Sequence, residues 1–181
     1  MSAIESVLAF WFRPAHREKW FVKDAAFDAA VATELSAAFQ AARRGDLSAW
    51  RGSPEGCLAL CILLDQVPRN LFRGSAEAFA ADAQARAITR HAVAEGYDRG
   101  LTQEQRLFLY MPLEHSEALA DQEDCCRLMA ALDEDPGWHD FALKHRDIVA
   151  RFGRFPHRNA ALGRPSTPEE ARFLTEPGSS F

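Results

Sequence analysis

An unbroken apolar segment, CLALCILL at Cys57–Leu64, constrains the fold more than any other feature of this 181-residue chain. Ser53 followed by Pro54 predicts a helix start just before it, because proline fits the first helical position, where its missing N–H costs nothing. A helix that is apolar on every face is normally buried on every face. We therefore expect a helix that is packed against other elements all round.

The remaining chain also carries helical signals. Apolar residues recur at helical spacing, and caps, glycine stops and prolines delimit the segments. The predicted helices begin near residues 4, 25, 54, 75, 102, 121, 138 and 168. Pro68 is expected to end the third helix, Gly96 the fourth, and Pro112 to kink or break the fifth.

No segment alternates apolar and polar residues as a strand does, and we find no repeat of fixed period and no long linker. The predicted fold class is therefore all-α, with about eight helices and short connections that favour antiparallel neighbours. We expect one domain over residues 1–181.

The charge balance argues against two classes of partner. The chain has 21 basic and 26 acidic residues, a net charge of −5, so its surface would repel a phosphate backbone and no nucleic acid is expected. The N-terminus has no basic leader, and no segment approaches the roughly 18 apolar residues of a membrane span. We expect a cytoplasmic protein with no membrane partner.

Four cysteines in such a protein are expected to be reduced thiols that fill the core. Neither cysteine pair has the two-residue gap of a zinc knuckle. A metal centre built from His115, Glu117 and a distant His145 or His157 is the less favoured alternative, because no compact ligand spacing supports it. We assign no metal and no particular cofactor.

Two histidines lie in apolar stripes by spacing. His115 falls between Met111 and Leu119, and His145 falls on the face that carries Phe141 and Ile148. Each is either a neutral core histidine bonded to a carbonyl or carboxylate, or a general base, proton-sensitive contact or ligand.

Asp65 directly follows the apolar helix, where an unpaired carboxylate would cost several kcal/mol. It should therefore pair with a cation. The candidates are arginines of two similar loops, PRN at 68–70 and PHRN at 156–159, and these loops and their flanks supply Arg69, Asn70, Arg73, Arg151, Arg154, Arg158 and Asn159.

Residues 151–164 contain four arginines and no acid. The segment could be a solvated basic patch, a structural network that ties Asp65 and helix ends, or a ligand site in which arginine forks bind a carboxylate or phosphate. Six arginines in the two loops outnumber Asp65, Glu114 and Glu117, so we expect at least one guanidinium to remain open.

Three segments, LALCILLDQVPRNLFRGSAEAFAAD, LFLYMPLEHSE and ARFGRFPHRNAALGRPSTPEE, closely resemble the bacterial family known as domain of unknown function 924. With VLAFWF and Trp20 the resemblance covers nearly the whole chain. It implies a fold similar to a tetratricopeptide-type helical array, with antiparallel stacked helices and a concave face. It implies no particular activity.

The resemblance and the residue patterns converge on segments 65–73, 110–117 and 151–164. We expect these segments to recognise a small anionic ligand, a phosphate or carboxylate, with acid/base chemistry by His115 or His157. The predicted binding residues are Asp65, Arg69, Asn70, Arg73, Glu117, His145, Arg151, Arg154, Arg158 and Asn159.

The alternative is a protein-interaction scaffold that binds a peptide on the concave helical surface. An enclosed pocket would favour the small molecule, and a long open groove would favour the peptide.

Overall fold

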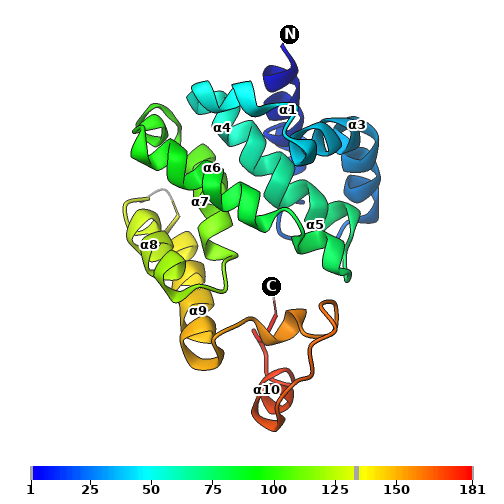
Figure 1. The fold of residues 1–181 in the computed structure, drawn as a ribbon, viewed down its shortest axis with the longest axis vertical. Helices are drawn as coiled ribbons and strands as arrows, with labels where there is room; N and C mark the ends of the chain where they lie inside the picture. Colours follow the sequence, from blue (N-terminus) through cyan, green and yellow to red (C-terminus); the bar gives the residue numbers. More distant parts are fainter. Residues whose placement is uncertain (1, 133–134, 181) are drawn as a thin grey trace.

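Helices form all the regular structure in the part of the chain that the computed structural model describes, residues 2–132 and 135–180 (Figure 1). The all-α prediction is confirmed, whereas the likeness to a tetratricopeptide array stays a prediction. The helices are α1 (Ala3–Trp11), α2 (Pro14–Arg17), α3 (Ala25–Arg44), α4 (Pro54–Cys61), α5 (Val67–Leu71), α6 (Asp82–Ala94), α7 (Gln103–Glu114), α8 (Leu119–Met129), α9 (Pro136–Phe152) and α10 (Pro168–Phe173).

Local capping explains most helix ends. Asp24 accepts a hydrogen bond from Phe27 N–H at 2.8 Å at the start of α3, and Gly45 ends that helix with a φ of 85°. Thr102 and Thr167 form the predicted capping boxes of α7 and α10. These boundaries agree with the sequence because each cap depends only on residues within one turn.

The apolar helix is longer than predicted. A π-helical turn, η2 (Ile62–Gln66), joins α4 to α5, so the helix continues to Leu71. The prediction that Pro68 ends the helix is wrong. Val67 N–H donates to Ile62 O, five residues back, and Pro68 lies in the first turn of α5, where its missing N–H is tolerated.

Two other predicted boundaries differ. The helix expected from residue 75 begins as a short 3₁₀ helix, η3 (Ala76–Phe79), and α6 starts afresh at Asp82. Helix α7 runs through Pro112 and ends at Glu114, two residues further on. Asp82 and Glu114 therefore both lie at helix ends, where their side chains enter the site described below.

The core surrounds the apolar helix, as predicted. Helix α4 contacts α1, α6 and α7, α5 contacts α3, and α8 packs between α7 and α9. Cys57–Leu64 is buried throughout. All four cysteines are buried and free, in keeping with core-filling thiols.

The chain after α9 forms a separate small unit of packing, which we call the C-terminal segment (residues 153–180). Gly153, with a φ of 68°, ends α9 and redirects the chain. Figure 1 shows this segment in orange to red beyond the end of the bundle. Its apolar contacts form a second, small cluster of Ile148, Val149, Phe152, Phe155 and Phe173.

No helix within residues 2–132 and 135–180 has both the length and the apolar character needed to cross a bilayer.

Candidate functional site

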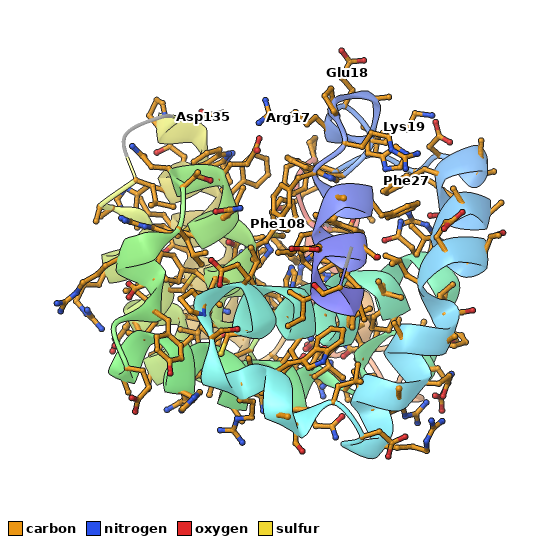
Figure 2. The ribbon with its side chains drawn as sticks, turned by 90° about the horizontal axis from the view of Figure 1, so that it is seen from above. Arg17, Glu18, Lys19, Phe27, Phe108 and Asp135 are labelled. Atoms are coloured by element: carbon orange, nitrogen blue, oxygen red, sulfur yellow. The ribbon has the colours of Figure 1, made fainter. Side chains whose placement is uncertain are left out.

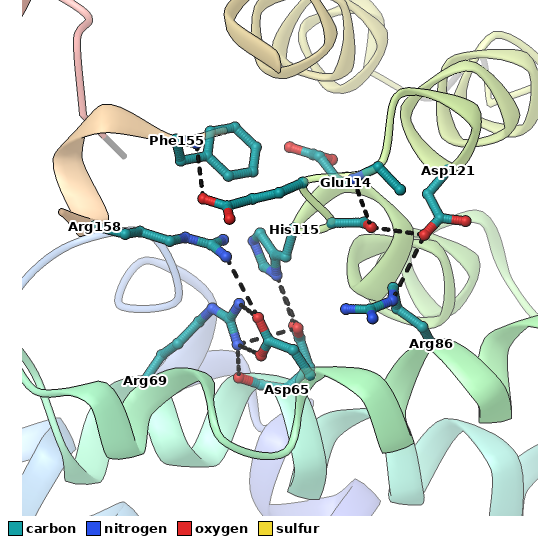
Figure 3. A network of polar contacts seen from close by, with 12 residues as sticks. Asp65, Arg69, Arg86, Glu114, His115, Asp121, Phe155 and Arg158 are labelled. Carbon is teal, nitrogen blue, oxygen red and sulfur yellow. Dashed lines mark hydrogen bonds and ion pairs between the residues drawn. The ribbon is translucent and has the colours of Figure 1, made fainter. Parts of the chain in front are cut away.

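Asp65, in the π-helical turn, is the centre of a buried polar cluster (Figure 3). Its side chain is 1% exposed, and Arg69 Nη1 lies 3.1 Å from Oδ1. Gln66 Nε2 donates to Oδ2 at 2.6 Å, and His115 Nδ1 lies 2.8 Å from Oδ1. Burial would raise the pKa of Asp65, but Arg69 and His115 outweigh burial and hold the pKa well below its usual range. The prediction of a buried Asp65 paired with an arginine is confirmed.

Asp82 contacts two arginines that are far apart in the sequence, Arg69 and Arg158. Arg69 donates to both of its oxygens, at 2.9 and 3.0 Å, in the fork geometry that suits a carboxylate. Arg158, in η5 (Pro156–Arg158), reaches only one of these oxygens, at 3.5 Å. Asp82 therefore neutralises the charge of Arg69 well and that of Arg158 poorly.

Arg158 is a buried cation with unused donor capacity. Its side chain is 7% exposed, and its guanidinium lies 4.6 Å from the centre of the Phe155 ring and 4.6 Å from that of Phe79. Its Nε–H has no hydrogen-bond acceptor among the described residues. Burial and the neighbouring Arg69 lower the pKa of Arg158 to about 10, which still leaves it charged near neutral pH.

His115 caps the C-terminal end of α7, and its ring enters the cluster. A carboxylate only accepts hydrogen bonds, so the contact with Asp65 assigns the proton to Nδ1 and leaves Nε2 as an acceptor. Burial and Arg69 lower the pKa of His115, and Asp65 opposes them without cancelling them. The imidazole is therefore neutral at pH 7.

Glu114 and His145 form a second buried pair. His145 Nδ1 lies 3.0 Å from Glu114 Oε1 and donates to Phe141 O at 2.9 Å. The distance to Glu114 suits an ion pair, but burial disfavours both charges. Burial, together with Asp65, raises the pKa of Glu114 to about 8, and burial lowers that of His145 to about 3. Glu114 and His145 are therefore both neutral at pH 7.

Glu117 attaches the C-terminal segment to the bundle. Phe155 N–H donates to Glu117 Oε1 at 2.8 Å, and Arg164 donates to both carboxylate oxygens at 2.7 and 2.8 Å. The His157 ring packs against Phe155, with the centres 5.5 Å apart, and burial and Arg158 lower its pKa to about 4. Phe155, His157 and Arg158 are thereby held beside Asp65 and His115.

The other predicted binding residues lie outside this cluster. Asn70 and Arg73 both bind Asp28 of α3, at 2.8 and 2.7 Å. Arg151, in the last turn of α9, pairs with Glu169. Within the C-terminal segment, Arg154 pairs with Glu170, and Asn159 contacts Arg164, Ser166 and Glu170.

Each of the six loop arginines has an acidic partner. The expectation that at least one guanidinium remains open rests on a count of too few acids: each of these six is ion-paired, and an open donor remains at the Nε–H of Arg158. That count left out Asp28, Asp82, Glu169 and Glu170. Arg158, whose ion pair is the longest of the six at 3.5 Å, comes nearest to the expected open cation.

Three residues of the cluster were not predicted from the sequence: Asp82, Gln66 and Phe79. A signal for Asp82 was present, because Asp82 shares a helical stripe with Ala85, Thr89 and Ala92, all of them buried. A carboxylate on such a stripe needs a cation, by the same reasoning that singled out Asp65. Nothing comparable marks Gln66 or Phe79.

Two surface hollows lie away from the cluster. One of about 440 Å³ is lined by Phe12, Arg17, Thr102, Glu104 and Gln105. The other, of about 190 Å³, lies between Ala42–Arg51 and α6. Neither is lined by a predicted site residue, so the candidate site is the cluster of buried charges that the C-terminal segment covers. Among the residues described, no three His, Cys, Asp or Glu side chains are placed to hold a metal ion.

Comparison with known proteins gives a family and a fold. A family model described as "Bacterial protein of unknown function (DUF924)" matches residues 7–178. The solved structure of a protein of unknown function, ATU0120 from Agrobacterium tumefaciens, is 43% identical to the chain. The match covers 94% of this chain and 96% of that one, with a TM-score of 0.90. No functionally curated protein matches the chain.

Proposed function

We propose that this chain, which belongs to the bacterial DUF924 family, binds a small anionic ligand through Arg158. The observation that carries the proposal is the buried Arg158 Nε–H without an acceptor among the described residues. Buried donors in native proteins are nearly always paired, and an unpaired one costs about 1 to 3 kcal/mol. A ligand oxygen would supply the missing acceptor.

The charges around Arg158 favour an anion over a neutral ligand. Arg69 and Arg158 share Asp82, and Arg69 makes the two short hydrogen bonds to that carboxylate, so Arg158 keeps only a contact of 3.5 Å. Burial and, after it, repulsion from Arg69 lower the pKa of Arg158. A phosphate or carboxylate at Arg158 would relieve this repulsion and accept charge-assisted hydrogen bonds.

The aromatic rings make the site selective for planar or compact anions. Phe79 and Phe155 lie over the Arg158 guanidinium, so the open edge of the guanidinium is its remaining binding direction. His115 and His157 are close enough to Arg158 for its charge to lower their pKa values. These two histidines are the neutral hydrogen-bonding groups of the proposed site.

A thermal-shift screen of orthophosphate, phosphate esters and dicarboxylates tests the proposal, with matched sodium chloride to separate binding from general screening. At 100 times its dissociation constant a ligand should stabilise the fold by about 2.7 kcal/mol. For a chain of this size that is a rise of roughly 5 to 10 °C in Tm.

Arg158→Gln should abolish the shift in Tm. Arg73→Gln is the matched control, because Arg73 pairs with Asp28 on α3 and lies outside the cluster. The control should retain the full shift. A parent protein that responds to none of these anions, or an Arg158→Gln variant that responds as the parent does, would refute the proposal.

The scaffold alternative has a different location. Phe21 and Val22 are 60% and 52% exposed, and Phe21 stacks on Phe108. Figure 2 looks onto this side, where Arg17 and Phe108 lie near α1, and the 440 Å³ hollow contains Arg17. Phe21→Ser should weaken the binding of a peptide at this place, whereas Arg158→Gln should leave that binding unchanged. Under either proposal we place the protein in the cytoplasm, where its four free thiols stay reduced.

A further inference from the structure

We infer that Asp65 and His115 act as a proton-transfer pair, with His115 Nε2 accepting a proton from the ligand bound at Arg158. In this pair Asp65 is the positioning residue and His115 is the general base. The inference rests on the proposed anion site and adds a reaction class, proton abstraction from an anionic substrate.

The carboxylate of Asp65 is held from several sides. Gln66 Nε2 fixes Oδ2, Arg69 Nη1 approaches Oδ1, and the π-helical turn supplies the backbone. His115 Nδ1 lies 2.8 Å and 3.0 Å from the two oxygens. A carboxylate held in this way orients the imidazole and selects the tautomer with a proton on Nδ1.

The other ring nitrogen faces the proposed ligand. Figure 3 shows the His115 ring between Asp65 and the guanidinium of Arg158. Asp65 occupies Nδ1, so Nε2 is the ring nitrogen that can accept a proton, and we place the X–H group of an anion bound to Arg158 beside it. In the step, Nε2 uses its lone pair to bond the proton. The electron pair of the X–H bond stays on X, and Arg158 faces the resulting negative charge.

The surroundings of His115 suit a base more than a permanent cation. Burial, Arg69 and Arg158 lower its pKa, so the neutral form is present at pH 7. Asp65 acts in the opposite direction and stabilises the imidazolium once the proton has arrived. The charged or titratable groups of the surrounding elements are Asp65, Arg69, Asp82, Glu114, Glu117, His145, His157 and Arg158.

A purely structural Asp–His contact would show the same distances, so the test must measure the reactivity of Nε2. The first measurement uses the parent protein, with ¹⁵N chemical shifts of the histidine rings at pH 7. We expect His115 to carry its proton on Nδ1 and an unprotonated Nε2. A proton on Nε2, or an imidazolium at pH 7, would overturn the inference.

The second measurement is the rate of carbethoxylation by diethyl pyrocarbonate, which reacts with neutral imidazole nitrogen. Peptide mass spectrometry gives this rate for each histidine as a function of pH. Asp65→Asn removes an opposite charge beside the ring, so the pH midpoint for His115 should fall by about 1 to 3 units, and its plateau rate should fall. His16 and His91, which bond to backbone oxygens elsewhere, are internal controls and should keep their rates.

The two proposals can fail separately. Orthophosphate should slow the labelling of His115 in the parent and not in Arg158→Gln. If phosphate neither protects His115 nor raises Tm, the anion site fails, and with it the substrate of the proposed base. If phosphate raises Tm but the midpoint for His115 is the same in Asp65→Asn, the anion site stands and the proton-transfer pair is refuted.

Discussion

Replacing Asp65 by alanine should destabilise the protein more than any single substitution on its surface. The change removes the acceptor of Gln66 Nε2, at 2.6 Å, and of His115 Nδ1, at 2.8 Å, and it removes one of the two anions of Arg69. Breaking a buried ion pair by removing one partner costs about 3 to 5 kcal/mol. Arg69 keeps Asp82, so we expect the lower part of that range.

Equilibrium unfolding in urea at pH 7 measures this cost. Asp28→Ala is the matched control, because it also removes a carboxylate that binds an arginine and an amide, Arg73 and Asn70. That pair is more exposed, with 35% of the Arg73 side chain and 21% of Asp28 accessible, and should contribute about 1 kcal/mol or less. Equal losses in the two variants would refute the reasoning that burial decides the cost.

The pH dependence gives a second check on Asp65. Its pKa in the folded protein is lower than the usual value of about 3.9 in an unfolded chain. The folded state therefore binds this proton more weakly, and the stabilisation is fully present above about pH 4 and is lost as the pH falls through the folded pKa. The difference in unfolding free energy between parent and Asp65→Ala should therefore narrow as the pH falls below about 4. A difference that does not narrow there would contradict a lowered pKa of Asp65.

Two further substitutions test other features. The pKa of Glu114 is raised to about 8, so the carboxyl group favours folding while protonated and opposes it as the pH rises through the interval from its ordinary value to 8. Glu114→Gln should therefore raise Tm at pH 9 and change it little at pH 5, and an equal effect at both pH values would contradict a buried neutral acid. Gly153 has a φ of 68°, where a side chain costs about 1 to 2 kcal/mol, so Gly153→Ala should lower stability by about that amount in urea. Gly52→Ala, with open space around the added methyl group, is its control, and an equally large loss there would argue against backbone strain at Gly153.

Local interactions made the helices predictable. Ser53 and Thr102 cap the helices that follow them, because the cap needs only a side-chain oxygen and a backbone N–H that lies within three residues of it. The burial of Cys57–Leu64 followed from its composition, and the pairing of Asp65 followed from the cost of an isolated buried charge. Each inference used residues close together in the chain.

The partners of the arginines and the extent of the apolar helix depend on long-range contacts. No sequence signal predicts the π-helical turn, and a helix that ended at Pro68 would not place Asp65 and Arg69 on one continuous helix. Arg69, in α5, pairs with Asp65 and Asp82, whereas Arg73, just beyond the end of α5, pairs with Asp28 on α3. Which acid each arginine meets depends on how α3, α6 and α10 pack, and a pattern in one segment does not contain that information.

The C-terminal segment carries the residue that would bind the ligand and also covers the place where the ligand would bind. Arg158 is buried between Phe155 of its own segment and Phe79 of η3, and it lines neither of the two surface hollows. A ligand could therefore reach Arg158 only while residues 153–180 are detached from α5 and α7. When the segment packs against the bundle again, the bound ligand would be enclosed together with Arg158.

Such an arrangement has a kinetic signature. The observed association rate should rise with ligand concentration at first and then level off at the opening rate of the segment, because opening precedes binding. Release should be slow for the same reason, since a bound anion adds its contacts with Arg158 to those that Glu117 already makes with Phe155 and Arg164. The protein would then retain its ligand by closing over it, with a lifetime set by the C-terminal segment more than by the strength of any single hydrogen bond.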